Sequence, residues 1–386
     1  MIWDRLKKSP GFKNISILGS STIVGNATSS IFWIYLAGLL GAEKYGELGY
    51  LISIAGIVST VCLVGGTWSM TVYTAKGMKI QPPLYIISLI SSCISLVIVF
   101  VIFDTISIGI FVIGYVIFQL FLAELLGSKL FKRYGKFYIL QKITFVCLAL
   151  SFNHIIGFEG IIIAYGASYL IFSFPVFKML TTVKPNFEIL KTKFSFVTSN
   201  YLYDLSSTAN GQIDKLIIAP IFGFALLGNY YLGLQIIGFL GILPGIVFNY
   251  ILPQDASGHS TTRIKKITLL SSVGFTLIGI FLIPPLMPIV FPEYTEAVTL
   301  LPILSLSVIP IAVQSIFISK LLGREKTRYV LISHLISIFV LVFGIIALGN
   351  EFGPEGIATA YVLSQVASAI LLVVAAQLLA KNESSS

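Results

Sequence analysis

The feature that most constrains this chain is a succession of apolar segments of about 20 residues each, separated by short polar stretches. A helix that crosses the hydrocarbon core of a bilayer needs about that many apolar residues. Lipid offers no hydrogen-bond partners to the backbone, so such segments must be helical. The sequence therefore predicts an all-α integral membrane protein with about 12 transmembrane helices. We place them at 15–40, 48–72, 84–103, 106–126, 139–156, 159–180, 194–220, 225–251, 267–291, 297–321, 329–349 and 356–380.

Composition supports this class. Of the 386 residues, 56% are hydrophobic and 11% are charged, whereas a soluble chain carries roughly 25% charged residues. The net charge of +9 does not indicate nucleic acid as a partner, because the basic residues lie in short loops between apolar runs. The three cysteines all lie in apolar runs and do not form a disulfide framework.

The positions of the basic residues predict the orientation. With 12 spans and both termini in the cytoplasm, 23 of the 25 Lys and Arg residues fall on the cytoplasmic side. Lys44 falls on the outer side and Lys215 within a span, and the outer loops carry acidic residues instead. This asymmetry follows the positive-inside rule. We therefore expect a multi-pass protein of the cell membrane, with an uncleaved first helix.

An internal repeat relates the two halves of the chain. Seven residues between positions 157 and 168 recur 196 positions later, and near the start of each half Gly41 and Gly46 match Gly223 and Gly228 at an offset of 182. The seven are Gly157, Glu159, Gly160, Ile161, Ala164, Tyr165 and Ser168. Six helices separate the copies, so both have the same orientation. We predict two pseudo-symmetric six-helix lobes, 1–190 and 191–386.

Parallel repeats of this kind occur in transporters whose substrate path lies between the repeats. The repeat therefore favours an alternating-access transporter with two lobes. The alternative is that duplication only enlarged a scaffold.

Polar side chains inside the membrane are costly, and they mark functional candidates. The seventh span concentrates them. Asn200, Asp204, Ser207, Gly211 and Asp214 follow one another at helical spacing on one face, and Lys215 lies beside Asp214. Lipid cannot satisfy such a face, so we expect it to line a cavity.

The candidates have alternative roles. Asp204 could bind a proton or a sodium ion, or it could be a structural group that neighbouring helices satisfy. Lys215 could attract an anionic headgroup, or it could be neutralised by Asp214 or reach the membrane surface. The Asn210-Gly211 dipeptide is a plausible site for the helix to break or bend.

Two further amides complete the predicted substrate and ion pathway. Asn26 belongs to a weakly polar stripe of the first span, where small residues often allow close helix packing. Gln235 is a single amide within the eighth span, and amides of this kind commonly join neighbouring helices.

Several functions are disfavoured. The sequence has no GxxxxGK[ST] phosphate-binding loop, so we expect no ATP hydrolysis by the usual machinery. The three histidines are scattered and predict no metal site, and nothing indicates a cofactor. No loop is long enough for a separate catalytic domain, so an integral-membrane enzyme such as a glycosyltransferase is disfavoured.

Three stretches carry a resemblance to a known family: IYLAGLLGAEKYGELGYLISI, IDKLIIAPIFGFALLGNYYLGLQI and SKLLGREKTRYVL. They resemble the polysaccharide-biosynthesis flippases of the multidrug/oligosaccharidyl-lipid/polysaccharide exporter superfamily. The resemblance implies a V-shaped, MATE-like fold of two six-helix bundles. It also implies the movement of polyprenyl-(pyro)phosphate-linked oligosaccharides from the cytoplasmic to the outer leaflet. The Asp-Lys/Arg dipeptide of that family falls on Asp214 and Lys215.

The expected function is therefore that of a flippase for lipid-linked oligosaccharide in polysaccharide biosynthesis. The alternative is a multidrug or small-solute antiporter on the same fold, driven by protons or sodium ions at Asp204. The expected partners are the lipid-linked oligosaccharide, membrane lipid and the coupling ion. Residue patterns do not separate the two functions. Lys215 is the one cation that we place clearly within a span.

Overall fold

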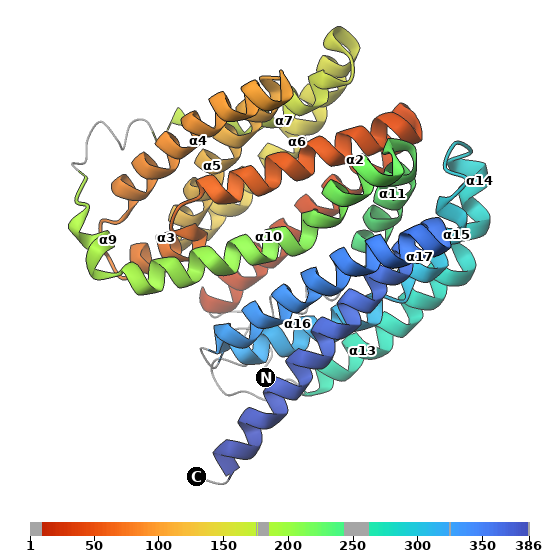
Figure 1. The fold of residues 1–386 in the computed structure, drawn as a ribbon. Coiled ribbons are helices and arrows are strands. Elements are labelled where there is room, and N and C mark those ends of the chain that lie inside the picture. Colours follow the sequence, from red (N-terminus) through yellow and green to blue (C-terminus); the bar gives the residue numbers. More distant parts are fainter. Residues whose placement is uncertain (1–9, 175, 177–184, 243–261, 324–325, 385–386) are drawn as a thin grey trace. The chain divides into compact units, whose positions relative to one another are not determined.

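The computed structural model describes residues 10–174, 176, 185–242, 262–323 and 326–384 (Figure 1). These residues form helices joined by short connections, which confirms the predicted all-α class. Seven helices among them are long and apolar enough to cross a membrane. They cover Ile17–Cys62, Gln81–Phe103, Ser107–Gly127, Phe131–Ile156, Arg263–Val290, Ala297–Leu322 and Thr327–Leu379. The total of about 12 stays a prediction.

Two of these helices contain a single glycine with non-helical backbone angles. Helix α2 runs from Pro10 to Cys62 and includes Gly41, with φ 75° and ψ 168°. Helix α17 runs from Thr327 to Ser384 and includes Gly353, with φ 59° and ψ −138°. Glycine adopts a positive φ without the steric cost that a side chain adds. We predicted loops between consecutive spans at these points, and one glycine marks each of them instead.

Three predicted spans are interrupted. The second, 48–72, contains the end of α2 at Cys62 and the start of α3 (Gly66–Ala75), and Gly65 and Gly66, where α3 begins, both have a positive φ. The ninth, 267–291, consists of α13 (Thr262–Leu277), a π-helical turn (Ile278–Leu282), a 3-10 turn (Pro284–Leu286) and α14 (Met287–Val290). The tenth divides into α15 (Ala297–Ser305) and α16 (Val308–Gly323). Hydropathy could not show the last two interruptions, which lie where prolines lack the N–H that a continuous helix needs.

The chain forms two compact units. The first combines Met1–Thr28 with Leu51–Thr208, and the second combines Ser29–Tyr50 with Ala209–Ser386. The lobes 1–190 and 191–386 describe the two copies of the sequence repeat, and their existence as six-helix bundles stays a prediction.

The first unit is built around α5 (Ser107–Gly127), which packs against α3, α4 (Gln81–Phe103) and α7 (Glu159–Leu170) (Figure 1). Helix α7 also packs against α6 (Phe131–Ile156). Most residues of α5 are buried, whereas α4 exposes Ile90, Ile94, Val97 and Val101 at helical spacing. That stripe is suited to contact with lipid. The predicted span 159–180 ends as a helix at Leu170, and part of the remainder lies outside the described residues.

In the second unit, α15 packs against α17 and against α11 (Phe224–Leu240), and α16 packs against α13 and α17. Leu300, Leu301 and Leu304 of α15 are fully buried and form part of the core. The predicted span 225–251 ends in residues that the structure does not describe.

The repeat is visible in backbone conformation. Gly223, with φ 89° and ψ 166°, matches Gly41, and Gly157, with φ 84° and ψ −157°, matches Gly353. These are the two offsets, 182 and 196, found in the sequence. Equivalent glycines thus shape the chain in the same way in both halves, which supports duplication.

Candidate functional site

Helix α10 (Phe194–Phe222) carries five of the seven predicted site residues. It is continuous, so the helix does not break at Asn210-Gly211, and a bend there stays a prediction. A glycine can remain helical when its neighbours maintain the hydrogen-bond ladder. Gly211 is exposed, with no atom within 4 Å of the place where a Cβ would be. The first unit ends at Thr208, within α10, so Asp204 belongs to the first unit and Asp214 to the second.

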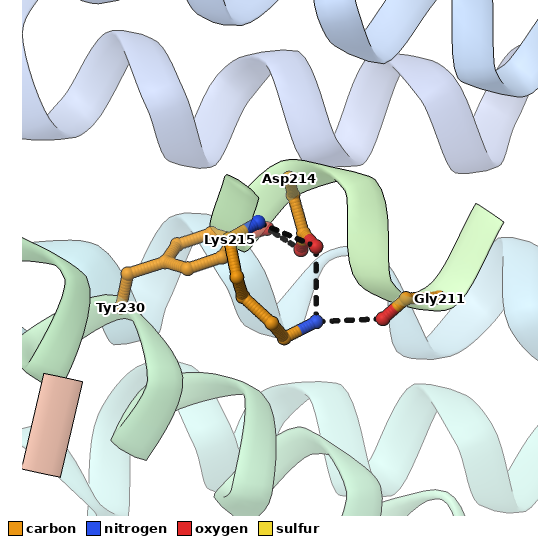
Figure 2. A network of polar contacts seen from close by, with 4 residues as sticks. All are labelled: Gly211, Asp214, Lys215 and Tyr230. Atoms are coloured by element: carbon orange, nitrogen blue, oxygen red, sulfur yellow. Dashed lines mark hydrogen bonds and ion pairs between the residues drawn. The ribbon is translucent and has the colours of Figure 1, made fainter. Parts of the chain in front are cut away.

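The Asp214–Lys215 pair forms a closed polar network in the second unit (Figure 2). The Lys215 Nζ donates to Asp214 Oδ1 at 2.9 Å and to the Gly211 carbonyl oxygen at 2.6 Å. The Tyr230 hydroxyl, from α11, donates to Asp214 Oδ2 at 2.8 Å. The backbone N–H of Lys215 also donates to Asp214 Oδ1, at 2.9 Å. Each charge therefore has several partners inside the protein.

Burial makes these partners necessary. Asp214 is 1% exposed and Lys215 is 4% exposed. An unpaired charge in such an environment would be very costly, and a hydrogen-bonded pair is tolerated. The sequence left open whether Lys215 meets a headgroup or is neutralised by Asp214. In this structure the ammonium is engaged with Asp214, and a role in cargo binding stays a proposal.

Asp204 belongs to α10, and its carboxylate contacts the first turn of α3 in the first unit. Its Oδ2 accepts from the Thr67 N–H at 3.2 Å and is 3.4 Å from Thr67 Oγ1. The first N–H groups of a helix lack partners within the helix, and the dipole favours a negative charge there. Gly66 permits the approach, because a Cβ at this position would lie 2.8 Å from Asp204 Oδ2. The Asp204 carboxylate thus caps the N-terminus of α3, the helix that forms the second part of the interrupted span 48–72.

The predicted amides have separate surroundings. Asn200 is one turn before Asp204, and its Nδ2 donates to the Phe196 carbonyl at 3.0 Å. Asn26 Oδ1 accepts from the Tyr138 hydroxyl at 2.7 Å. Asn210 Oδ1 is buried and has no hydrogen-bond partner among the described residues. Gln235 is half-buried on α11.

Lys142 was not among the predicted site residues. We counted it with the cytoplasmic cations although it lies just inside the predicted span 139–156, and α6, which begins at Phe131, places it well inside the helix. Its Nζ lies 5.6 Å from the ring centroid of Tyr138 and 5.9 Å from that of Tyr165. Lys142 therefore lies within the candidate span Phe131–Ile156. The spacing of Tyr134, Tyr138 and Lys142, four residues apart on one helix face, could have revealed the site.

Solved structures with a similar fold match this chain over nearly its whole length. A multidrug resistance MATE family transporter of the MOP superfamily, in an inward-facing conformation, has a TM-score of 0.67 and 15% identity, and the match covers 94% of this chain and 96% of the other. The fold is that of the MATE transporters.

Two further structures share this fold. A MOP superfamily transporter from Pyrococcus furiosus has a TM-score of 0.67 and 15% identity, covering 97% of each chain. The lipid II flippase MurJ, in an inward closed conformation, has a TM-score of 0.76 and 12% identity, covering 93% of this chain and 87% of its own. No known family model matches the sequence, and no curated protein matches it. At these identities the similarity concerns the fold.

Proposed function

We propose that the chain is a flippase that translocates a polyprenyl-(pyro)phosphate-linked oligosaccharide from the cytoplasmic to the outer leaflet of the cell membrane. The observation that carries the proposal is the fold shared with the lipid II flippase MurJ along 93% of this chain. MurJ is a flippase of lipid II, so its cargo is a lipid. The MATE-like fold, in this proposal, comprises 12 helices in two lobes that alternate access to a polar path.

Polar groups at membrane depth support a hydrophilic cargo. Asp204 and Lys142 lie within helices of the first unit and remain partly exposed, although a carboxylate or an ammonium in lipid is costly. Such groups would shelter a polar headgroup while its lipid tail stays in the bilayer.

The test is the movement of a fluorescent lipid-linked oligosaccharide in liposomes that contain the purified protein. Asp204→Asn should reduce the rate about tenfold, because a hydrogen bond to a charged group contributes about 1.5–3 kcal/mol. Ser199→Ala on the same helix is the control, since Ser199 is exposed and donates only to its own helix at Ser195. Full activity of Asp204→Asn would remove this residue from the pathway.

The multidrug fold match also favours a proton- or sodium-coupled antiporter of drugs or small solutes, with Asp204 binding the ion. The same liposomes separate the two functions. Transport of an organic cation against an imposed proton or sodium gradient, without movement of the lipid-linked sugar, would favour the antiporter. Movement of the lipid-linked sugar would favour the flippase.

The proposed orientation has both termini in the cytoplasm. In a variant without native cysteines, exposed positions Lys44, Glu159 and Glu293 replaced by cysteine should react with an impermeant thiol reagent from outside intact cells. Cysteines at the exposed positions Lys132 and Glu188 should react only after the cells are opened. The opposite pattern would reverse the orientation.

A further inference from the structure

We infer that Lys142 and the tyrosines around it form a binding subsite for a phosphate that is attached to a sugar. The inference rests on the proposed function and deepens it by assigning the headgroup to residues of the first unit. The tyrosine cluster comprises Tyr115 of α5, Tyr134 and Tyr138 of α6, and Tyr165 and Tyr169 of α7. None of these residues belongs to the pathway that the sequence predicted.

Lys142 lies within the candidate span Phe131–Ile156, away from the ends of α6. It follows Phe131, the first residue of α6, by 11 residues, which is about 16 Å along a helix. Lys136, the last exposed cation before it, precedes Lys142 by six residues, so Lys142 lies about 9 Å further along the helix than the cations of the first turns. Three basic residues on the first turns of α6 precede it and are exposed: Lys132, Arg133 and Lys136. They are suited to the interface, whereas Lys142 requires a polar environment within the protein.

The tyrosine cluster supplies this environment. Tyr138 and Tyr165 flank the ammonium at 5.6 and 5.9 Å from their ring centroids. Tyr165 stacks on Tyr169 at 5.0 Å between centroids, and Tyr169 meets Tyr115 edge-on at 5.6 Å. On the other side, Tyr134 stacks on Tyr138 at 5.9 Å. Aromatic faces attract a cation within about 6 Å of the centroid, so the rings hold the ammonium without neutralising it.

The packing of α2 against this site is also specific. A Cβ at Gly25 would lie 2.8 Å from Tyr138 Cδ1 and 3.7 Å from Lys142 Cγ. Glycine therefore allows α2 to approach, and it brings Asn26 within 2.7 Å of the Tyr138 hydroxyl. An exposed amide thus adjoins the ring that contacts Lys142.

The charge of Lys142 has no carboxylate partner among the described residues, in contrast with Lys215. Lys142, Tyr115, Tyr134 and Tyr138 are all partly exposed. An ammonium with three donors is suited to phosphate oxygens. Tyrosine rings and hydroxyls are suited to the apolar faces and hydroxyl groups of a sugar. The combination points to a phosphorylated carbohydrate.

The experiment measures binding to the purified protein in detergent by native mass spectrometry. The probes are a polyprenyl-phosphate-linked disaccharide, a soluble sugar monophosphate and the free disaccharide. Lys142→Met should weaken binding of the lipid-linked probe at least tenfold, and Lys142→Arg should retain most of it. Tyr138→Leu should weaken binding, whereas Tyr138→Phe, which keeps the ring, should weaken it less. Lys136→Met, an exposed cation six residues earlier on α6, is the matched control.

The probes distinguish the source of the phosphate. Binding of the soluble sugar phosphate that depends on Lys142 would assign the subsite to a free solute, and binding of the lipid-linked probe alone would assign it to a lipid headgroup. Equal binding of both phosphate probes by Lys142→Met and the wild type would overturn the inference, as would the absence of binding in the wild type. Thermal unfolding of each variant shows whether it is folded. If Lys142→Met does not fold, the test rests on Lys142→Arg instead. If the wild type flips a lipid-linked sugar and a folded Lys142→Met flips it equally fast, this inference fails and the proposed function stands.

Discussion

Replacing Gly228 by valine should destabilise the protein by about 3 kcal/mol or more, because backbone atoms of α2 occupy the space that the side chain needs. A Cβ at Gly228 would overlap the carbonyl oxygen of Ala42, and a Cβ at Gly46 would overlap the carbonyl oxygen of Phe224. The obstacles are main-chain atoms of two helices, which cannot rotate away as a side chain can. The measurement is the thermal unfolding temperature in detergent, together with the yield of monodisperse protein. Gly46→Val should have a similar effect.

Gly238→Val provides the control on the same helix. Gly238 lies ten residues after Gly228 on α11 and has no atom within 4 Å of its Cβ position. This variant should change stability by about 0.5 kcal/mol or less, as surface substitutions usually do. A Gly228→Val protein with the stability of Gly238→Val would show that the two helices are not in contact at this point.

The Gly46–Gly228 contact also repeats itself. Ala42 and Gly46 correspond to Phe224 and Gly228 at the offset of 182. Gly228 faces the carbonyl oxygen of Ala42, and Gly46 faces the carbonyl oxygen of Phe224. The two contacts are therefore related by the pseudo-symmetry of the repeat. For this reason, Gly46→Val and Gly228→Val should lower the thermal unfolding temperature by similar amounts.

Much of the fold could be predicted from the sequence because lipid imposes a simple rule on apolar segments. Spans 84–103 and 106–126 agree with α4 and α5 to within a few residues, and the paired glycines Gly41 and Gly223 have like conformations. The start of α6 was missed because Lys132, Arg133 and Lys136 lower the hydropathy of a segment that is nevertheless helical. Cations at the interface can reach water from a helix, so charge does not end a helix there.

The candidate site was harder to predict, because its partners come from distant parts of the chain. The helical spacing of Asp204 and Asp214 predicted their importance. It could not show that Asp204 accepts hydrogen bonds from Thr67, 137 residues away. Likewise, nothing in the local sequence indicates that Tyr230 donates to Asp214 across the turn between α10 and α11. Tertiary packing determines these partners, and a pattern within one helix does not contain that information.

Lys215→Met should destabilise the protein by roughly 3–5 kcal/mol, because it leaves the Asp214 carboxylate buried without its counter-charge. Asp214→Asn should be destabilising for the complementary reason, since it leaves a buried ammonium. Thermal unfolding measures both effects. The exposed neighbours Glu43 and Lys44 provide a matched control, because Glu43→Gln and Lys44→Met change an adjacent acid–base pair in water. These variants should shift stability by less than about 1 kcal/mol.

The double variant Asp214→Asn with Lys215→Met separates a structural role from a role in transport. It removes both charges, so its destabilisation should be smaller than the sum of the two single effects by at least about 1 kcal/mol. If the pair only supports the second unit, the flipping rate should recover together with stability. If the pair also meets the cargo, the double variant should be stable and still slow in flipping. Strictly additive destabilisation would contradict the contact between Lys215 Nζ and Asp214 Oδ1.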